Sequence, residues 1–266
     1  MAKEYTPHTR KEKLAALDEF LNVLETLRVK CPWDRKQTNE SLRPNTVEEV
    51  YELVDALMAD DQKNICKELG DVLLHVGFYA LIGEEKEEFD IADVCNMLVE
   101  KLKFRHPHIY GDIQADTAEE VKQNWEKIKL KERDGNKTVL GGVPSALPAM
   151  IKANRIQEKA RNVGFDWEQP SDVWNKVREE VEEVQQEIDS NDAEKLEGEF
   201  GDLLFAVINA ARLYGVDPEN ALEKTNRKFI SRFNHIEKRA REMGKSLSEM
   251  TLEEMDALWN EAKGIK

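Results

Sequence analysis

Residues 178–189 read REEVEEVQQEID, a stretch in which six of the twelve residues are acidic and two are valines. Residues three apart on an α-helix lie on the same face, so Glu180 and Glu183 are expected to project together. A solvent-exposed helix face would explain the acidic residues, and a metal site would explain their spacing. For a single acidic pair of this kind, the exposed face is the better interpretation. The rest of the sequence has to decide between an exposed face and a metal site.

The acidic pattern occurs twice. Two motifs recur at a constant offset: EEVYE at 48–52 with EEVEE at 179–183, and KELGDVLL at 67–74 with GEFGDLLF at 198–205. The offset is the same for both (180 − 49 = 199 − 68 = 131), so Glu49 and Glu68 are separated by as many residues as Glu180 and Glu199. Chance similarity between acidic helices would not preserve both motif and spacing, and we therefore predict two similar domains in tandem.

Composition indicates a helical protein that is a poor generic binder of nucleic acids. The chain has 266 residues, enough for two modest domains, and its 40% hydrophobic content allows a buried core. Many charged residues (35%) with few glycines (13) and prolines (8) favour helices, and no alternating strand pattern is found. A net charge of −15 disfavours a nucleic-acid polymer as partner, because phosphate binding needs a cationic surface.

Cysteine usage and the absence of long apolar segments predict a cytoplasmic location. Cys31, Cys66 and Cys95 form no CxxC pair, and free thiols are typical of a reducing compartment. The first residues show no secretory signal, and no run approaches the roughly 18 apolar residues of a membrane helix. We therefore expect no membrane association.

Apolar periodicity predicts helices along both halves of the chain. The first is marked by leucines and Phe20 between positions 14 and 24, and the others are expected at about 46–60, 62–82, 91–104, 117–131, from 149 onward, 171–190, 192–214, 218–243 and 251–262. Capping boxes at Thr46 (TVEE) and Thr117 (TAEE), and an Asp217–Pro218 start, mark three of the helix N-termini. Glycine and proline cluster at 134–148, which predicts a linker between domains at 1–133 and 149–266.

The carboxylates of the second half are expected to converge. A short connection near 190–191 makes the two helices antiparallel neighbours, so Glu180 and Glu183 would face Glu199 and Asp202. Four such anions repel one another unless a hard divalent cation lies between them, and Mg²⁺ is the obvious candidate. The first half keeps the same residue types at Glu49, Glu52, Glu68 and Asp71.

Neither set includes the histidine of an ExxH di-iron motif. His75 follows Asp71 by four residues, but the equivalent position in the second half is Ala206.

A cationic stripe in the second half suits a polyphosphate next to bound metal. Lys224, Lys228 and Arg232 are spaced four residues apart, Asn226 lies in the same stretch, and Lys195 precedes the GEFGD motif. An ordinary solvated basic face is an equally good interpretation of these residues alone. The first half does not reproduce the set, since Asn64 replaces the lysine of position 195.

With these motifs in view, the chain resembles the MazG family of nucleoside triphosphate pyrophosphohydrolases in its tandem-domain bacterial form, within the all-α NTP pyrophosphatase superfamily. The resemblance covers nearly the whole chain and includes the duplicated acidic motifs, CPWDRKQT at 31–38, RHPHIYGD at 105–112 and NVGFDW at 162–167. It implies an all-α fold, a tandem pair of four-helix-bundle-like domains and a homodimer. It also implies Mg²⁺-dependent hydrolysis of nucleoside triphosphates, ATP among them, to nucleoside monophosphate and pyrophosphate, with Mn²⁺ as a substitute metal.

The resemblance also implies roles for residues of the second half. The implied metal ligands and catalytic residues are Glu180, Glu183, Glu199 and Asp202. The implied substrate contacts are Lys195, Lys224, Asn226, Lys228 and Arg232, with Trp259 as a partner for the base or sugar or, alternatively, a packed core tryptophan. Metal-activated water is expected to attack the α-phosphorus in line, one Glu accepting its proton. The first half departs from the pattern at Asn64, so the second domain is expected to do most of the turnover; Asn39, where relatives have QTH, lies outside the acidic set.

Other interpretations stay open. A related pyrophosphohydrolase acting on dUTP or phosphoribosyl-ATP shares the acidic motif, and a non-catalytic helical scaffold that binds metal would show it too. His106 and His108 could ligate a metal, although a turn enforced by Pro107 explains RHPH better.

Overall fold

The computed structural model describes residues 6–115, 117, 120–121, 128, 138–167, 169–190 and 192–264. Its regular elements within those ranges are α-helices and short 3-10 helices, with no strand, so the predicted all-α fold class is confirmed. The chain divides into two compact units, Met1–Gln114 and Ala115–Lys266. The predicted linker at 134–148 falls inside the second unit, and its first four residues lie outside the described ranges.

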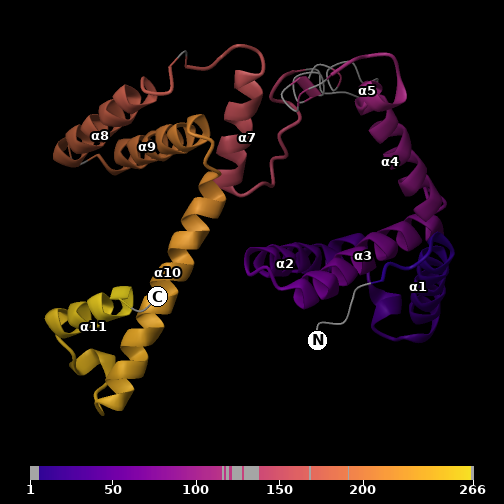
Figure 1. Cartoon of the computed structure of the whole chain (residues 1–266), viewed down its shortest axis with the longest axis horizontal. Helices are drawn as coiled ribbons and strands as arrows, with labels where there is room; N and C mark the ends of the chain where they lie inside the picture. Colours follow the sequence, from indigo (N-terminus) through magenta and orange to yellow (C-terminus); the bar gives the residue numbers. More distant parts are fainter. Residues whose placement is uncertain are drawn as a thin grey trace. The chain divides into compact units, whose positions relative to one another are not determined.

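The first unit contains a hairpin of two long helices. Its elements are α1 (Arg10–Lys30), η1 (Asp34–Lys36), α2 (Asn39–Met58), α3 (Gln62–Glu85), α4 (Ile91–Arg105) and α5 (Pro107–Tyr110) (Figure 1). Helices α2 and α3 pack side by side, and Leu24, Leu42, Phe78 and Ile82 form the core that joins them to α1. Gly77 permits this close approach, because a Cβ there would lie 2.7 Å from Leu24 Cδ2.

The start of α2 corrects one prediction. The helix begins at Asn39, not at Thr46, and Thr38 caps it by accepting a hydrogen bond from Ser41 N at 3.2 Å. Thr46 lies inside the helix, where its hydroxyl donates to the Leu42 carbonyl at 3.0 Å. The TVEE signature favoured a later start, but burial of Leu42 to 1% exposure in the core stabilises the additional turns.

Within its described residues, the second unit consists of two hairpins and a shorter helix. Its elements are α7 (Ala149–Arg161), α8 (Val173–Ser190), α9 (Ala193–Leu213), α10 (Pro218–Glu242), η2 (Leu247–Glu249) and α11 (Leu252–Gly264) (Figure 1). One core, Val173, Val177, Ala206 and Ala210, joins α8 to α9. A second, Ile236, Ala240, Met250 and Leu258, joins α10 to α11. The acidic motifs thus lie on a two-helix hairpin in each unit.

Two predicted helix starts are confirmed. Asp217 caps α10 by accepting from Asn220 N at 2.8 Å, and Pro218 occupies the first helical position. Thr117 and Glu120 make the reciprocal bonds of a capping box, at 3.2 and 3.3 Å. The rest of the helix predicted at 117–131 lies mostly outside the described residues.

The length of the helices and the state of the cysteines bear on two further predictions. Among them, no helix combines the length and apolar character needed to cross a bilayer. Cys31, Cys66 and Cys95 are free thiols.

Candidate metal and nucleotide site

Three of the four predicted ligands in the second half converge. Glu180 on α8 and Glu199 and Asp202 on α9 each offer a carboxylate oxygen, and these oxygens lie within 4.8 Å of one another. The short connection between α8 and α9 aligns the two helices so that their acidic faces meet. We call Glu180, Glu183, Glu199 and Asp202 the second cluster.

Glu180 shows that the second cluster fits a cation. Its side chain is 6% exposed; one carboxylate oxygen lies 2.7 Å from Lys176 Nζ, while Oε2 is buried without a partner among the described residues. Leaving a buried polar atom unsatisfied costs about 1–3 kcal/mol. Hard divalent cations bind several carboxylate oxygens at once, so the donor set of this cluster suits Mg²⁺ or Mn²⁺.

Glu183 lies one turn after Glu180 on α8, outside the convergent trio. Desolvation raises the pKa of its carboxyl above the ordinary value, and hydrogen bonding to Glu180 and repulsion from Glu180 and Glu199 raise it further. Without a cation between them, the carboxylates therefore repel one another, and this repulsion favours the protonated form of Glu183.

The first half reproduces the convergence. Glu49 on α2 and Glu68 and Asp71 on α3 place carboxylate oxygens within 4.8 Å of one another. Glu68 is 6% exposed, and its Oε2 is buried without a partner within the described residues. Desolvation, followed by the charges of Asp71, Glu52 and Glu68, raises the pKa of Glu49. We call Glu49, Glu52, Glu68 and Asp71 the first cluster, and its donor set also fits a hard cation.

The layer beside the two clusters differs. In the first half, Thr46 Oγ1 lies 2.9 Å from His75 Nδ1 and 2.6 Å from Tyr79 Oη. The equivalent positions of the second half, 131 residues later, are Val177, Ala206 and Ala210, all in an apolar core. His75 does not join the convergent trio, and burial lowers the pKa of its imidazole, although Asp71 partly opposes that shift.

The predicted substrate contacts are not bonded to the second cluster in the described part of the chain. They are distributed over three helices: Lys195 on α9; Lys224, Asn226, Lys228 and Arg232 on α10; and Trp259 on α11. Lys195 Nζ pairs with Asp192 at 3.7 Å, and Asn226 donates to Glu223 at 3.3 Å. Within the described ranges, no hydrogen bond or ion pair joins any of the six to the second cluster.

Trp259 packs within the α10–α11 hairpin. Its ring lies 5.0 Å from that of Phe229, and the Arg232 guanidinium lies over it at 5.3 Å from the ring centroid. Packing and a cation–π contact thus explain this tryptophan in the isolated chain.

The RHPH segment forms a turn. His106 ends α4 and precedes α5, and its Nδ1 lies 2.6 Å from the Leu102 carbonyl oxygen. The His106 and His108 rings are 5.6 Å apart, but neither belongs to a potential metal-binding group among the described residues.

Sequence reasoning missed two lysines at the clusters. Lys176 Nζ lies 2.7 Å from Glu180 and 2.7 Å from Glu179, and Lys67 contacts the first cluster. The hydrogen bonds and charges of Glu179 and Glu180 raise the pKa of Lys176 above its ordinary value. The i, i+4 spacing of Lys176 and Glu180 was the available signal.

The NVGFDW segment borders a pocket instead of the second cluster. This pocket has a volume of about 500 Å³ and is lined by α7, α9 and the segment itself, with Trp167, Phe205 and Asn209 among its walls. Arg212 donates to both Asp166 carboxylate oxygens. Burial alone would raise the pKa of Asp166, but these bonds hold it below its ordinary value.

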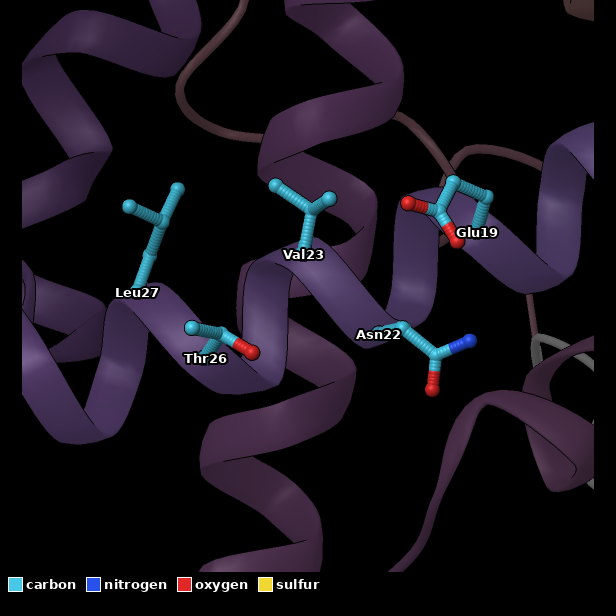
Figure 2. Close-up of a pocket in the computed structure, with 5 residues that line it drawn as sticks. All are labelled: Glu19, Asn22, Val23, Thr26 and Leu27. Atoms are coloured by element: carbon cyan, nitrogen blue, oxygen red, sulfur yellow. The ribbon is translucent and has the colours of Figure 1, made fainter.

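A smaller hollow of about 190 Å³ lies on α1 (Figure 2). All five lining side chains come from one face of this helix: Glu19, Asn22, Val23, Thr26 and Leu27. Because it gathers no groups from a second element, we assign no chemistry to it.

Comparison with known proteins identifies the class. The sequence model of the MazG nucleotide pyrophosphohydrolase domain matches residues 37–110 and 168–237, and each match contains one complete acidic cluster. The tandem all-α fold with paired acidic helices is thus that of a hydrolase of the nucleotide pyrophosphohydrolase class. The chain belongs to the MazG family.

Relatives match over both halves. The chain is 42% identical over 257 residues to the nucleoside triphosphate pyrophosphohydrolase/pyrophosphatase MazG of Thermotoga maritima, covering 96% of this chain and 98% of that protein. It is 40% identical over 254 residues to the nucleoside triphosphate pyrophosphohydrolase of Escherichia coli K12, covering 93% and 97%. It is also 45% identical to the uncharacterized protein YabN of Bacillus subtilis, covering 97% of this chain but 54% of that protein.

Proposed function

We propose that this protein hydrolyses nucleoside triphosphates to nucleoside monophosphate and pyrophosphate with Mg²⁺, or Mn²⁺ in its place. The observation that carries the proposal is the convergence of Glu180, Glu199 and Asp202, whose carboxylate oxygens lie within 4.8 Å of one another, together with Glu180 Oε2, which is buried and has no partner among the described residues. The names of the Thermotoga and E. coli relatives support the choice of substrate class.

Glu180, Glu183, Glu199 and Asp202 would hold the metal. When bound, it supplies Lewis-acid activation of water and of the triphosphate. One of the glutamate side chains would accept a proton from the attacking water. The first cluster has the same residue types and would form a second metal site, with the second domain responsible for most of the turnover.

The basic side chains would bind the phosphates. Lys195 precedes Glu199 by one helical turn and therefore lies on the same side of α9. Lys224 and Lys228 are exposed on α10, so their ammonium groups are accessible to an anion. Arg232 and Asn226 would complete the cationic stripe, and Trp259 would contact the base or sugar.

A homodimer would bring these substrate-binding residues closer to one of the two acidic clusters. It would also cover an apolar surface. Five apolar positions on each acidic hairpin are between 38% and 58% exposed and correspond at the 131-residue offset. They are Val50, Leu57, Leu69, Leu73 and Val76 in the first half, and Val181, Ile188, Phe200, Leu204 and Val207 in the second. Two helices cannot bury such a face alone, whereas a second hairpin would complete a four-helix bundle.

Product analysis tests the proposed reaction. The purified chain is incubated with each common nucleoside triphosphate, and with dUTP and phosphoribosyl-ATP, in the presence of Mg²⁺, and the products are separated. Monophosphate with pyrophosphate is expected. Diphosphate with orthophosphate would place the attack at the γ-phosphorus and contradict the proposal, and exclusive use of dUTP or phosphoribosyl-ATP would favour the related enzymes.

A non-catalytic metal-binding scaffold is the second candidate, favoured by the lack of any hydrogen bond or ion pair between the cationic residues and the second cluster among the described residues. It predicts metal binding without turnover of any nucleotide. Metal binding measured on the same preparation therefore distinguishes a scaffold from an inactive sample.

A further inference from the structure

The first cluster contains a cation supplied by the chain. Lys67 Nζ lies 2.9 Å from Glu68 Oε1, 3.4 Å from Asp71 Oδ2 and 3.9 Å from Glu52 Oε2. Three of the four carboxylates of this cluster therefore surround one ammonium group. An ammonium carries three donors and no acceptor, so it neutralises carboxylates but cannot coordinate a metal.

Among the described residues, no single ammonium group contacts three carboxylates of the second cluster. The position equivalent to Lys67 is Gly198 (67 + 131), so no side chain is available there. Lys176 contacts one carboxylate of the cluster, Glu180, and the non-cluster residue Glu179. Among the described residues, no ion pair reaches Glu199 or Asp202. The carboxylates of α9 therefore keep their full charge for an external cation.

We propose that Lys67 is a built-in counter-ion that weakens divalent-metal binding to the first cluster, so that the two domains bind metal with unequal affinity and the second domain binds more tightly. A divalent ion among Glu68, Asp71 and Glu52 must either displace the ammonium or remain beside a like charge. The inference rests on the metal binding included in the proposed function.

The first cluster still has the capacity to bind an ion once Lys67 moves away. Glu68 Oε2 is buried and lacks a partner among the described residues, because Lys67 contacts only Oε1. The Lys67 side chain is 60% exposed, so it can turn into solvent without opening a cavity. Removing Lys67 should therefore change the charge of the site and leave the packing of α3 intact.

Mn²⁺ titration of the full chain without nucleotide tests the inference, since the electron paramagnetic resonance signal of free Mn²⁺ is lost on binding. We expect a tight and a weak class in the wild type, and Glu180→Gln should abolish the tight one. Lys67→Ala should strengthen the weak class on the order of tenfold, within the usual range for coupled sites. Lys63→Ala, which removes a lysine one turn earlier on α3, is the matched control and should leave both classes unchanged.

The reciprocal variant moves the counter-ion into the second cluster. A Cβ at Gly198 would meet no atom within 4 Å, so a side chain can be introduced there. Gly198→Lys should weaken the tight class roughly tenfold, while Gly198→Gln, of similar length but uncharged, should not. Circular dichroism verifies that each variant is folded. If Gly198→Lys does not fold, the Lys67→Ala titration alone tests the inference.

The outcomes separate this inference from the proposed function. Two equal classes in the wild type, or a weak class unaffected by Lys67→Ala, would overturn the role of Lys67 while leaving metal binding intact. Absence of Mn²⁺ binding in the wild type and in every variant would overturn metal binding itself, and the role of Lys67 with it.

Discussion

At the scale of the residue, Glu180 is the side chain on which the proposed reaction depends most directly. It is buried in the α8–α9 hairpin, it belongs to the convergent trio, and one of its oxygens has no partner within the described residues. Glu49 occupies the equivalent position of the first half. The pair therefore offers a comparison in which the same substitution is made at equivalent positions of the two acidic hairpins.

Glu180→Gln should lower kcat/KM for the best nucleoside triphosphate by roughly 100-fold or more, because it removes one charge from the proposed metal site while preserving side-chain volume. Steady-state rates of pyrophosphate release measure the effect. Glu49→Gln serves as control and should retain most of the activity. Equal losses in the two variants would contradict the assignment of turnover to the second domain.

His75 provides a residue-scale prediction about pH. Burial lowers the pKa of its imidazole in the folded chain below the ordinary value of about 6.5. As pH falls through that range, the unfolded chain takes up the proton first, so His75 contributes stability above about pH 6.5 that is lost as pH falls through the folded pKa. Urea unfolding at pH 8 and pH 5.5 should therefore show a smaller pH dependence for His75→Ala than for the wild type.

The same variant has a second expected property. His75→Ala copies Ala206 of the second half but removes the imidazole that lies 2.9 Å from Thr46 Oγ1, so it should be less stable than the wild type at pH 8. An unchanged pH dependence would show that His75 is not the group that titrates.

At the scale of the element, the sequence predicted the described helices and the convergence of the acidic faces within each hairpin. Both follow from the order of residues alone, through apolar periodicity and the 131-residue repeat. Sequence reasoning placed the start of α2 at Thr46, because a local capping signature says nothing of the tertiary burial of Leu42. It also missed Lys67 and Lys176, because the contacts of their long side chains with carboxylates depend on how the hairpins pack. Local signals thus predict elements better than they predict contacts between them.

Two glycines of α3 test the packing of that helix. Gly77→Ala should destabilise the first unit by about 1–3 kcal/mol, because its Cβ would lie 2.7 Å from Leu24 and 2.8 Å from Phe20. Gly70→Ala is the control: nothing lies within 4 Å of its Cβ, so the better helix propensity of alanine should stabilise by about 0.5–1 kcal/mol. Chemical denaturation measures both, and a stabilising Gly77→Ala would show that α1 and α3 pack less closely.

At the scale of the whole molecule, the question is what covers the apolar positions of the two acidic hairpins. Phe200, Leu204 and Val207 follow one face of α9, and Leu69, Leu73 and Val76 follow the equivalent face of α3. A large exposed apolar surface on both hairpins at the same register indicates an interaction surface, not scattered surface residues. Pairing with a second copy would bury it, and the isologous contacts of a twofold dimer use the same patch on each chain.

The dimer is tested by the mass of the chain in solution. The wild type should have twice the 30.7 kDa mass of one chain in light scattering after size exclusion. Leu204→Glu, which places a charge in the centre of the proposed contact, should raise the dissociation constant about 100-fold, as the loss of a central interface residue does. Leu252→Glu is the control, because Leu252 on α11 is 68% exposed and lies outside the hairpin faces. A monomeric wild type, or equal effects of the two substitutions, would contradict the homodimer and leave the apolar faces to another partner.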